Sequence, residues 1–339
     1  MKKVIVGFSG GIDSTATALI LREAGYTVQL LTLQITDDIG LLDRACRRAE
    51  QLDLPWESLD VRELFRHEVI DYFIESYRRG ETPSPCAVCN ARIKWPLLYD
   101  AMRQKGYDYI ATGHYVRIES VGERYYVQQG VDPNKDQSYY LWDLPQKYLQ
   151  SALTPLGSFC KSEILRRYGQ SDTPRESMSI CFLSGISCTE YLQRHLPVNP
   201  GEIIDETGHV IGRHAGYALY TIGQKKGLQT DREGMVVTEI DPLHNRLRVG
   251  PFQTLQHHHL LLHPYRITDP VLLQPPGSFS VRIRGIGQNP GGKARLIEQT
   301  ADTLHLYLEE PALAASPGQP VVLYDQDRVL GGGFLKSYF

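Results

Sequence analysis

The first 110 residues alternate between short apolar runs and longer segments with apolar residues at helical spacing. The apolar runs are residues 2–8, 27–35 and 108–113. The segments with apolar side chains every three or four positions are residues 14–25, 41–52 and 92–106. This alternation predicts a parallel sheet with helices on both faces, that is, a doubly wound α/β fold. Because ligands of such sheets bind beyond the carboxyl ends of the strands, we expect the functional site there.

After about Pro197 the pattern changes to short alternating runs separated by Gly, Pro, Asn and Asp. Residues 201–212 and 236–250 each predict a β-hairpin. Six further short runs have the spacing of a small β-barrel or sandwich, namely residues 259–263, 278–286, 292–299, 303–310, 320–326 and 328–335. The chain therefore predicts three domains, which are an α/β domain, a small mostly-β central domain and a C-terminal β-barrel, over residues 1–195, 196–252 and 253–339.

Composition and charge exclude several classes of protein. The 339 residues are 42% hydrophobic and 22% charged, which is typical of folded globular chains. The 36 Lys and Arg residues against 39 Asp and Glu give a net charge of -3, so RNA binding requires a local basic surface. No run approaches the roughly 18 apolar residues of a membrane-spanning helix, and the N-terminal run lacks a cleavage site. We expect a cytoplasmic protein without membrane association, in which six cysteines serve packing, metal binding or chemistry.

A glycine-rich loop stands between the first expected strand and the first expected helix. It consists of Gly7, Phe8, Ser9, Gly10, Gly11, Ile12, Asp13 and Ser14. Its glycines allow consecutive backbone N–H groups to converge on an anion, and the helix N-terminus adds partial positive charge. The pattern is neither a Walker loop nor a dinucleotide fingerprint. It resembles the S-G-G-x-D-S signature of the PP-loop ATP pyrophosphatases, which implies that the loop binds ATP and that Asp13 positions Mg²⁺.

Cys89 is the first cysteine with chemically suggestive neighbours. It lies in residues 82–90, which read TPSPCAVCN, before a helix that we expect to begin near Ala91. Arg92 and Lys94 follow closely in the sequence. A helix N-terminus and adjacent cations favour the thiolate form of a cysteine, so Cys89 is a candidate nucleophile.

Cys181 gains interest from other motifs in the chain. Its own surroundings, residues 177–182, form a short apolar run that also fits a buried core cysteine. Five motifs occur in order along the chain, namely ATGHY (111–115), KDQSYYL (135–141), SICF (179–182), YTIGQKKGL (220–228) and LGGG (330–333). Together with the glycine-rich loop they resemble the tRNA-specific 2-thiouridylases of the MnmA family over nearly the whole chain. The resemblance implies a PP-loop, HUP-like first domain.

The resemblance also implies a sulfurtransferase reaction. The family replaces oxygen with sulfur at carbon 2 of the wobble uridine, position 34 of tRNA, and produces 2-thiouridine, AMP and pyrophosphate. ATP adenylates the unreactive carbonyl oxygen, and sulfur then arrives as a persulfide on Cys181. Cys89 is the partner nucleophile, and the two cysteines can end the reaction as a disulfide. A sulfur-donor relay protein or cysteine desulfurase is therefore an implied partner.

Further residues receive binding roles from the same resemblance. Leu33, which also fits a plain strand residue, and Gly113 border the nucleotide. The residues that the resemblance places near tRNA are Ser84, Pro85, Cys86, His114, Lys135, Asp136, Gln137 and Gln319. His114 and Asp136 fit equally well as loop or cap residues. We expect the chain to act as a monomer.

One position departs from the family pattern. The family has an aspartate three residues before its first catalytic cysteine, and this chain has Cys86 there. Cys86, Cys89 and Cys181 together supply three thiolates, a set able to hold a 4Fe-4S cluster with one open iron. Alternatively, Cys86 and Cys89 form a reversible redox pair. No metal ligand is assigned, and two wider alternatives remain open: another PP-loop adenylating or cluster-dependent thiolating enzyme, and a non-enzymatic tRNA-binding or sulfur-carrier protein.

Overall fold

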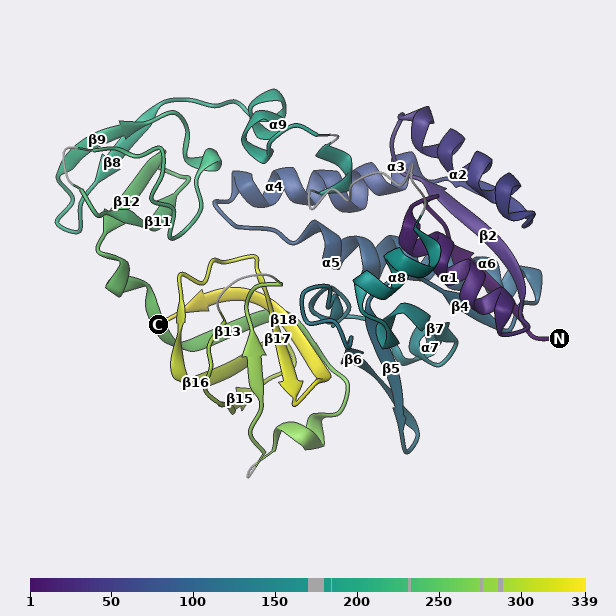
Figure 1. Ribbon diagram of the computed structural model, residues 1–339. Coiled ribbons are helices and arrows are strands. Elements are labelled where there is room, and N and C mark those ends of the chain that lie inside the picture. Colours follow the sequence, from purple (N-terminus) through teal and green to yellow (C-terminus); the bar gives the residue numbers. More distant parts are fainter. Residues whose placement is uncertain (170–179, 184, 231–232, 275–276, 286–288) are drawn as a thin grey trace. The chain divides into compact units, whose positions relative to one another are not determined.

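The computed structural model describes residues 1–169, 180–183, 185–230, 233–274, 277–285 and 289–339 (Figure 1). The chain divides into two compact units that alternate along the sequence. The first unit comprises residues 1–69, 86–178 and 327–330. The second unit comprises residues 70–85, 179–326 and 331–339. Within the described ranges, the structure contains no helix with the length and apolar character needed to cross a membrane.

The first unit contains a five-stranded sheet in which every pairing is parallel. Its strands, in spatial order, are β3 (Trp56–Asp60), β2 (Thr27–Gln34), β1 (Lys3–Gly7), β4 (Tyr109–Ala111) and β7 (Ala152–Leu153). The predicted parallel sheet is confirmed, and the three apolar runs form its central strands. The sequence does not reveal the two edge strands, because β3 is largely exposed and β7 has only two residues.

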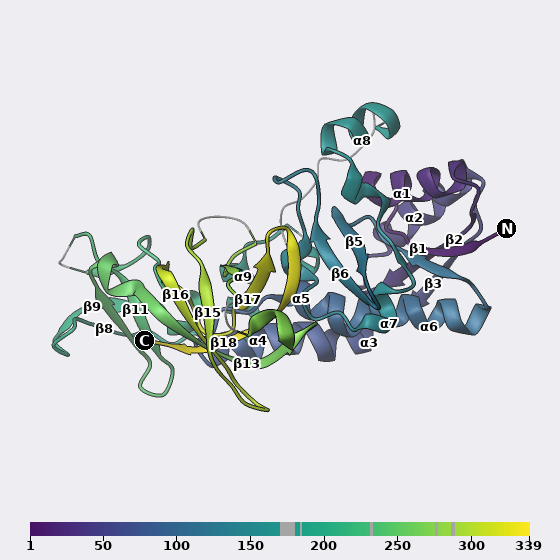
Figure 2. The same cartoon turned by 90° about the horizontal axis from the view of Figure 1, so that it is seen from below.

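Helices cover both faces of this sheet. Val4 and Val6 pack on one face against α1 (Ile12–Glu23) and α2 (Ile39–Leu52). On the other face, a Cβ atom added to Gly7 would lie 3.1 Å from a methyl carbon of Leu98, which belongs to α6 (Trp95–Lys105). Figure 2 shows the sheet between α1 and α2 on one side and α6 on the other. Since successive strand residues face opposite ways, this arrangement confirms the doubly wound fold.

The remaining helical segments include two continuous runs with π-helical stretches. The first run consists of α3 (Arg62–Phe65), η1 (Arg66–Asp71) and α4 (Tyr72–Arg78). The second consists of α5 (Pro85–Cys89), η2 (Asn90–Lys94) and α6. The prediction that this helix begins near Ala91 is wrong, because Pro85 starts it; proline is well suited to a first helical turn. The other α-helices are α7 (Gln146–Leu149), α8 (Lys161–Tyr168) and α9 (Cys188–His195).

The second unit holds most of two further sheets. One has the strand order β10 (Gln229–Thr230), β9 (Val210–His214), β8 (Gly201–Ile204), β12 (Arg246–Gly250) and β11 (Val236–Asp241). The other has the path β14 (Ser280–Arg282), β17 (Pro320–Asp325), β18 (Arg328–Tyr338), β13 (Gln256–Ile267), β16 (Leu304–Leu313) and β15 (Ala294–Gln299). Both predicted hairpins, β8–β9 and β11–β12, are confirmed as antiparallel pairs. The expectation of a mostly-β second half is likewise confirmed.

A hairpin of the first unit pairs with the start of β18, where residues 327–330 belong to the same unit. It consists of β5 (Val116–Val121) and β6 (Arg124–Gln129), and β6 pairs with the first residue of β18. The short 3-10 helices of the described residues are η3 (Ser138–Tyr140), η4 (Pro155–Ser158), η5 (Cys181–Leu183), η6 (Tyr217–Leu219), η7 (Phe252–Leu255) and η8 (Pro270–Leu273).

Candidate functional site

The glycine-rich loop lies between β1 and α1, as the sequence predicts. Gly10 has φ +71°, and a Cβ atom there would lie 2.8 Å from the Cα atom of Ala45 on α2. Only glycine fits this position without strain. Gly11 is the N-cap of α1 and provides no side-chain cap. The glycine-rich loop therefore leads directly into the N-terminus of α1, which is the arrangement of an anion-binding site.

The hydroxyl group of Ser14 forms hydrogen bonds within the glycine-rich loop. The Ser14 Oγ atom donates to the carbonyl oxygen of Gly11 (3.1 Å) and accepts from the backbone N–H of Ser9 (3.2 Å). The Thr15 hydroxyl is buried, and among the described residues its oxygen has no hydrogen-bond partner.

Asp13, in the first turn of α1, contacts residues far away in the sequence. Its Oδ1 atom accepts from the hydroxyl of Tyr115 (2.7 Å) and from Nζ of Lys161 (2.7 Å). A Cβ atom on Gly113 would lie 3.1–3.2 Å from atoms of Asp13, so the absence of a side chain permits the segment after β4 to approach the loop. The structure thus brings Asp13 and Gly113 together. Leu33, half-buried, is the penultimate residue of β2, whose Leu31 pairs with Gly7 at the end of β1.

Cys86 and Cys89 lie at the start of the α5–η2–α6 run. Cys86 is exposed and Cys89 is half-buried. Residues three apart on a helix share one face, so the two thiols are neighbours along that face. The cation of Arg92, which the sequence suggested as a partner for the thiolate, instead pairs with Glu68 (3.0 Å).

Within the second unit, the residues just before Cys86 rest on a loop of the C-terminal barrel. The backbone N–H of Thr82 donates to the carbonyl oxygen of Pro317 (2.8 Å), and the hydroxyls of Thr82 and Ser316 are 2.8 Å apart. The Oε1 atom of Gln319 accepts from the backbone N–H of Ser316 (3.0 Å). Gln319 therefore shapes the loop that supports the approach to Ser84 and Pro85.

Cys181 is exposed and begins η5 in the second unit. The apolar neighbours of Cys181 also fitted a buried core cysteine. The buried residue is instead Phe182, which is only 6% exposed. The Phe182 ring lies 5.2 Å from that of Phe73 on α4 and 5.4 Å from that of Tyr191 on α9, both at steep angles. Phe182 thus anchors the turn that presents the Cys181 thiol. Residues 177–179 of the same motif lie outside the described residues.

His114 is buried, and its ring contacts protein side chains rather than solvent. It is 7% exposed, its Nδ1 atom lies 2.8 Å from the hydroxyl oxygen of Thr112, and its ring stacks on Trp95. Burial, followed by the charge of Lys94, holds the pKa of His114 well below its usual value. A direct contact between this ring and tRNA would require it to leave this position.

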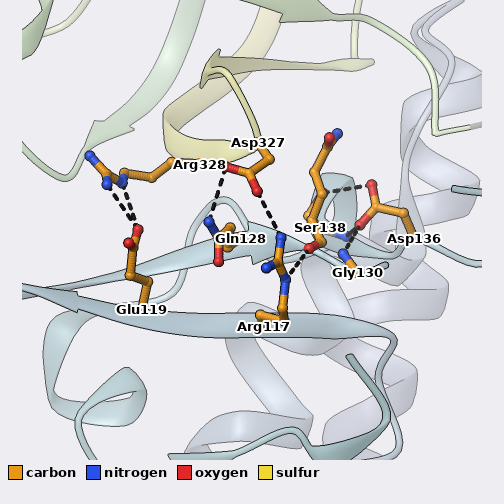
Figure 3. Close-up of polar contacts among 9 residues, drawn as sticks. Arg117, Glu119, Gln128, Gly130, Asp136, Ser138, Asp327 and Arg328 are labelled. Carbon is orange, nitrogen blue, oxygen red and sulfur yellow. Dashed lines mark hydrogen bonds and ion pairs between the residues drawn. The ribbon is translucent and has the colours of Figure 1, made fainter. Parts of the chain in front are cut away.

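The predicted tRNA-contacting segment Lys135–Gln137 is a turn with its polar groups engaged. Asp136 accepts from the backbone N–H of Gly130 (3.2 Å) and from the hydroxyl of Ser138 (2.9 Å), as Figure 3 shows. The Oε1 atom of Gln137 accepts from the backbone N–H of Tyr115 (3.0 Å), the residue whose hydroxyl reaches Asp13. Gln137 is therefore linked to the glycine-rich loop through Tyr115.

Ion pairs attach the β5–β6 hairpin to the start of β18 in the first unit (Figure 3). Arg328 donates to Glu119 through Nε (3.0 Å) and Nη2 (2.9 Å), and Arg117 pairs with Asp327 (2.7 Å). Gln128 adds a bond to the same aspartate (3.0 Å). These residues are about 200 positions apart, and no local sequence signal marks them as partners.

A metal site is not evident around the cysteines. Among the residues that the structure describes, no three His, Cys, Asp or Glu side chains are grouped so that they could hold a metal ion. The iron–sulfur cluster suggested for Cys86, Cys89 and Cys181 is therefore not supported.

Three family models match successive parts of the chain. They are a tRNA methyl transferase HUP domain over residues 2–185, a tRNA methyl transferase PRC-barrel domain over 189–251 and an aminomethyltransferase beta-barrel domain over 257–335. The chain is 39% identical to the tRNA-specific 2-thiouridylase MnmA 2 of Phocaeicola vulgatus, covering 98% of this chain and 97% of that protein. It is 39% identical to the MnmA of Chlorobaculum tepidum (98% and 95% covered) and 36% identical to that of Acaryochloris marina (100% of both). The chain therefore belongs to the family of the tRNA-specific 2-thiouridylases.

Proposed function

We propose that this chain is an ATP-dependent enzyme that forms 2-thiouridine at wobble position 34 of tRNA. As a member of its family it is a PP-loop thiouridylase, a sulfurtransferase-type enzyme. The observation that most favours sulfur chemistry is the exposed thiol of Cys181, presented on a turn by a buried aromatic anchor. A PP-loop enzyme that only adenylates has no use for such a thiol.

The residues around the glycine-rich loop fit ATP. Gly10 packs against the backbone of α2 and Gly113 against Asp13, so glycine at both positions lets these segments pack closely around the loop, and the uncapped N-terminus of α1 follows directly. In this proposal residues 7–14 hold the pyrophosphate portion of ATP, Leu33 and Gly113 border the nucleotide, and Asp13 holds Mg²⁺. Bound Mg²⁺ would neutralise phosphate charge during attack at the α-phosphorus.

The cysteines then act in sequence. The uridine O2 atom attacks the α-phosphorus of ATP and pyrophosphate leaves, which makes the C2–O bond easy to break. The terminal sulfur of a Cys181 persulfide attacks C2 and AMP departs. The Cys89 thiolate attacks the Cys181 sulfur, so that the persulfide S–S bond breaks, the transferred sulfur stays on C2 and a Cys89–Cys181 disulfide forms. An external thiol reductant restores both cysteines for the next cycle.

The other expected roles belong to the same proposal. Ser84, Pro85, Cys86, Lys135, Asp136, Gln137 and Gln319 form the tRNA-contacting set, and His114 supports it from the interior. A sulfur-donor relay protein or cysteine desulfurase loads Cys181, and the chain works as a cytoplasmic monomer. Its domains span residues 1–195, 196–252 and 253–339.

The test is mass spectrometry of wobble nucleosides from tRNA incubated with the protein, ATP, Mg²⁺, a cysteine desulfurase with cysteine as the persulfide donor, and a thiol reductant. We expect 2-thiouridine at position 34, and its loss in the Cys89→Ser and Cys181→Ser variants. Cys46→Ser is the matched control, because Cys46 lies on α2 and bonds only to Glu50 among the described residues. Thiolation by both catalytic-cysteine variants at the control rate would contradict the sulfur-transfer mechanism.

ATP–pyrophosphate exchange in the presence of tRNA separates the remaining alternatives. Exchange without thiolation of any nucleoside would identify a PP-loop enzyme that adenylates another substrate. Absence of both exchange and thiolation would indicate a non-enzymatic tRNA-binding or sulfur-carrier protein. Thiolation that tracks iron and acid-labile sulfide content after anaerobic purification would favour the cluster-dependent route.

A further inference from the structure

Lys161 is a nearly buried lysine directed at the glycine-rich loop. Its side chain is 10% exposed, and its Nζ atom donates to Oδ1 of Asp13 (2.7 Å). The same Nζ atom lies 5.6 Å from the centre of the Tyr115 ring. An ammonium group removed from water is unfavourable unless it is paired, so the contact with Asp13 stabilises this position. The roles assigned so far make no use of Lys161.

The backbone fixes where this side chain begins. Lys161 is the first residue of α8, and its N–H donates to Oδ2 of Asp132 (2.9 Å). The N-cap Cys160 and Glu163 form a capping box, with the Cys160 N–H donating to Glu163 Oε2 (2.9 Å). The backbone from which the lysine side chain extends is therefore fixed at the start of a capped helix.

The pair is asymmetric in its exposure. The Asp13 side chain is 30% exposed, three times as exposed as that of Lys161, and Asp13 belongs to the part of the glycine-rich loop that forms the first turn of α1. A ligand entering at the loop thus meets the carboxylate first. A phosphate arriving there carries more negative charge than Asp13 and competes with it for the ammonium, because Lys binds phosphate as a compact point charge.

We propose that Lys161 is a phosphate-binding residue that exchanges partners. Without ligand it neutralises Asp13; when ATP enters the loop it pairs with the pyrophosphate portion, and Asp13 is released to hold Mg²⁺. Each charge remains paired before and after the exchange. This inference rests on the proposed use of ATP by the loop, and it adds a binding residue from α8 that local sequence signals do not reveal.

The experiment is calorimetric titration of the full-length protein with inorganic pyrophosphate in magnesium-free buffer, followed by ATP. Lys161→Met should weaken pyrophosphate binding by about tenfold or more, the order expected from losing one hydrogen bond to a charged group. Lys161→Arg should retain most of the affinity. Asp13→Asn should bind magnesium-free pyrophosphate more tightly than the unchanged chain, because the competing carboxylate is gone. Lys105→Met is the matched control, since Lys105 also pairs with a glutamate in the first unit, at 2.8 Å from Glu57.

The outcomes separate this inference from the function on which it rests. If the Lys161→Met affinity equals that of Lys105→Met, Lys161 is only a counter-ion and the inference is wrong, while the proposed ATP use stands. If Lys161→Met does not fold, Asp13→Asn decides: unchanged or weaker pyrophosphate binding overturns the exchange. If the unchanged chain binds neither pyrophosphate nor ATP with or without Mg²⁺, the proposed ATP use itself falls, and this inference falls with it.

Discussion

Replacing Phe182 with alanine removes the side chain that anchors the turn of Cys181. Phe182 is buried, and its ring contacts those of Phe73 and Tyr191 at 5.2 and 5.4 Å. Truncation of a buried phenylalanine costs about 3–5 kcal/mol, of which each aromatic pair contributes about 0.5–1.5 kcal/mol. Because Phe182 lies on a short 3-10 turn, we expect a value near the lower limit, about 3 kcal/mol, in the free energy of unfolding of the second unit.

The Phe182→Ala variant should also lose one of the two proposed activities and keep the other. Without its anchor, the Cys181 thiol samples many positions, so the rate of tRNA thiolation should fall while ATP–pyrophosphate exchange persists. Urea denaturation measures the first effect, and nucleoside mass spectrometry with an exchange assay measures the second. Phe182→Leu, which keeps most of the buried volume, is the matched control. A double-mutant cycle of Phe182→Leu and Phe73→Leu should show a coupling of about 0.5–1.5 kcal/mol in the free energy of unfolding.

Two results would contradict the role of Phe182 in fixing the Cys181 turn. If Phe182→Ala unfolds at the same urea concentration as the unchanged chain and thiolates tRNA equally fast, the ring does not fix the Cys181 turn. Equal losses of exchange and thiolation would also refute it, because the damage would then extend to the loop in the first unit.

Three other changes test separate parts of the site. Cys86→Ser should retain thiolation, since a persulfide route needs only two cysteines. If nucleoside mass spectrometry of this variant shows no 2-thiouridine, the result would favour the iron–sulfur cluster. Gly10→Ala should destabilise the fold by about 1–3 kcal/mol and weaken ATP binding in calorimetry, because its Cβ atom meets the α2 backbone at 2.8 Å and φ is +71°. The third change concerns pH. Burial depresses the folded-state pKa of His114, so the unfolded chain binds more protons below the ordinary pKa of about 6.5. The contribution of neutral His114 to the free energy of unfolding is therefore complete above about pH 6.5 and is lost as the pH falls, by up to about 1.4 kcal/mol per pH unit. Urea titrations at decreasing pH should show a smaller loss of stability for His114→Gln than for the unchanged chain.

The sequence predicts those elements whose signals are local. The central strands of the parallel sheet are buried on both faces, and their continuous apolar runs therefore identify them. The glycine-rich loop is equally local, because its glycines, serines and the start of α1 are consecutive. By contrast, β3 exposes most of its residues, and β7 is too short to have a pattern. The expected helix start near Ala91 was too late in the chain, because proline is compatible with a first helical turn and Pro85 begins the helix that contains Cys86 and Cys89.

The candidate site contains several contacts that no sequence pattern encodes. Lys161 reaches Asp13 across 148 positions, and Arg328 reaches Glu119 across 209. Such pairs depend on the assembled fold, and a lone lysine or arginine in a sequence is normally an exposed surface residue. Motif resemblance identified Asp13 because the glycine-rich loop surrounds it. It could not identify the partner of Asp13, since α8 has no chemical signature of its own.

The glycine-rich loop and Cys181 are supported by different elements, and this difference predicts two separable half-reactions. The loop that we propose for ATP is held by its own hydroxyls and by α2, all within the first unit. Cys181 is held by the aromatic rings of α4 and α9 in the second unit. A change in the aromatic anchor should therefore spare adenylation and stop sulfur transfer, whereas Gly10→Ala should stop adenylation and leave the Cys181 thiol as reactive toward iodoacetamide as before. If both changes abolish both activities to the same degree, then the two supports are not independent, and the assignment of adenylation and sulfur delivery to separate units must be abandoned.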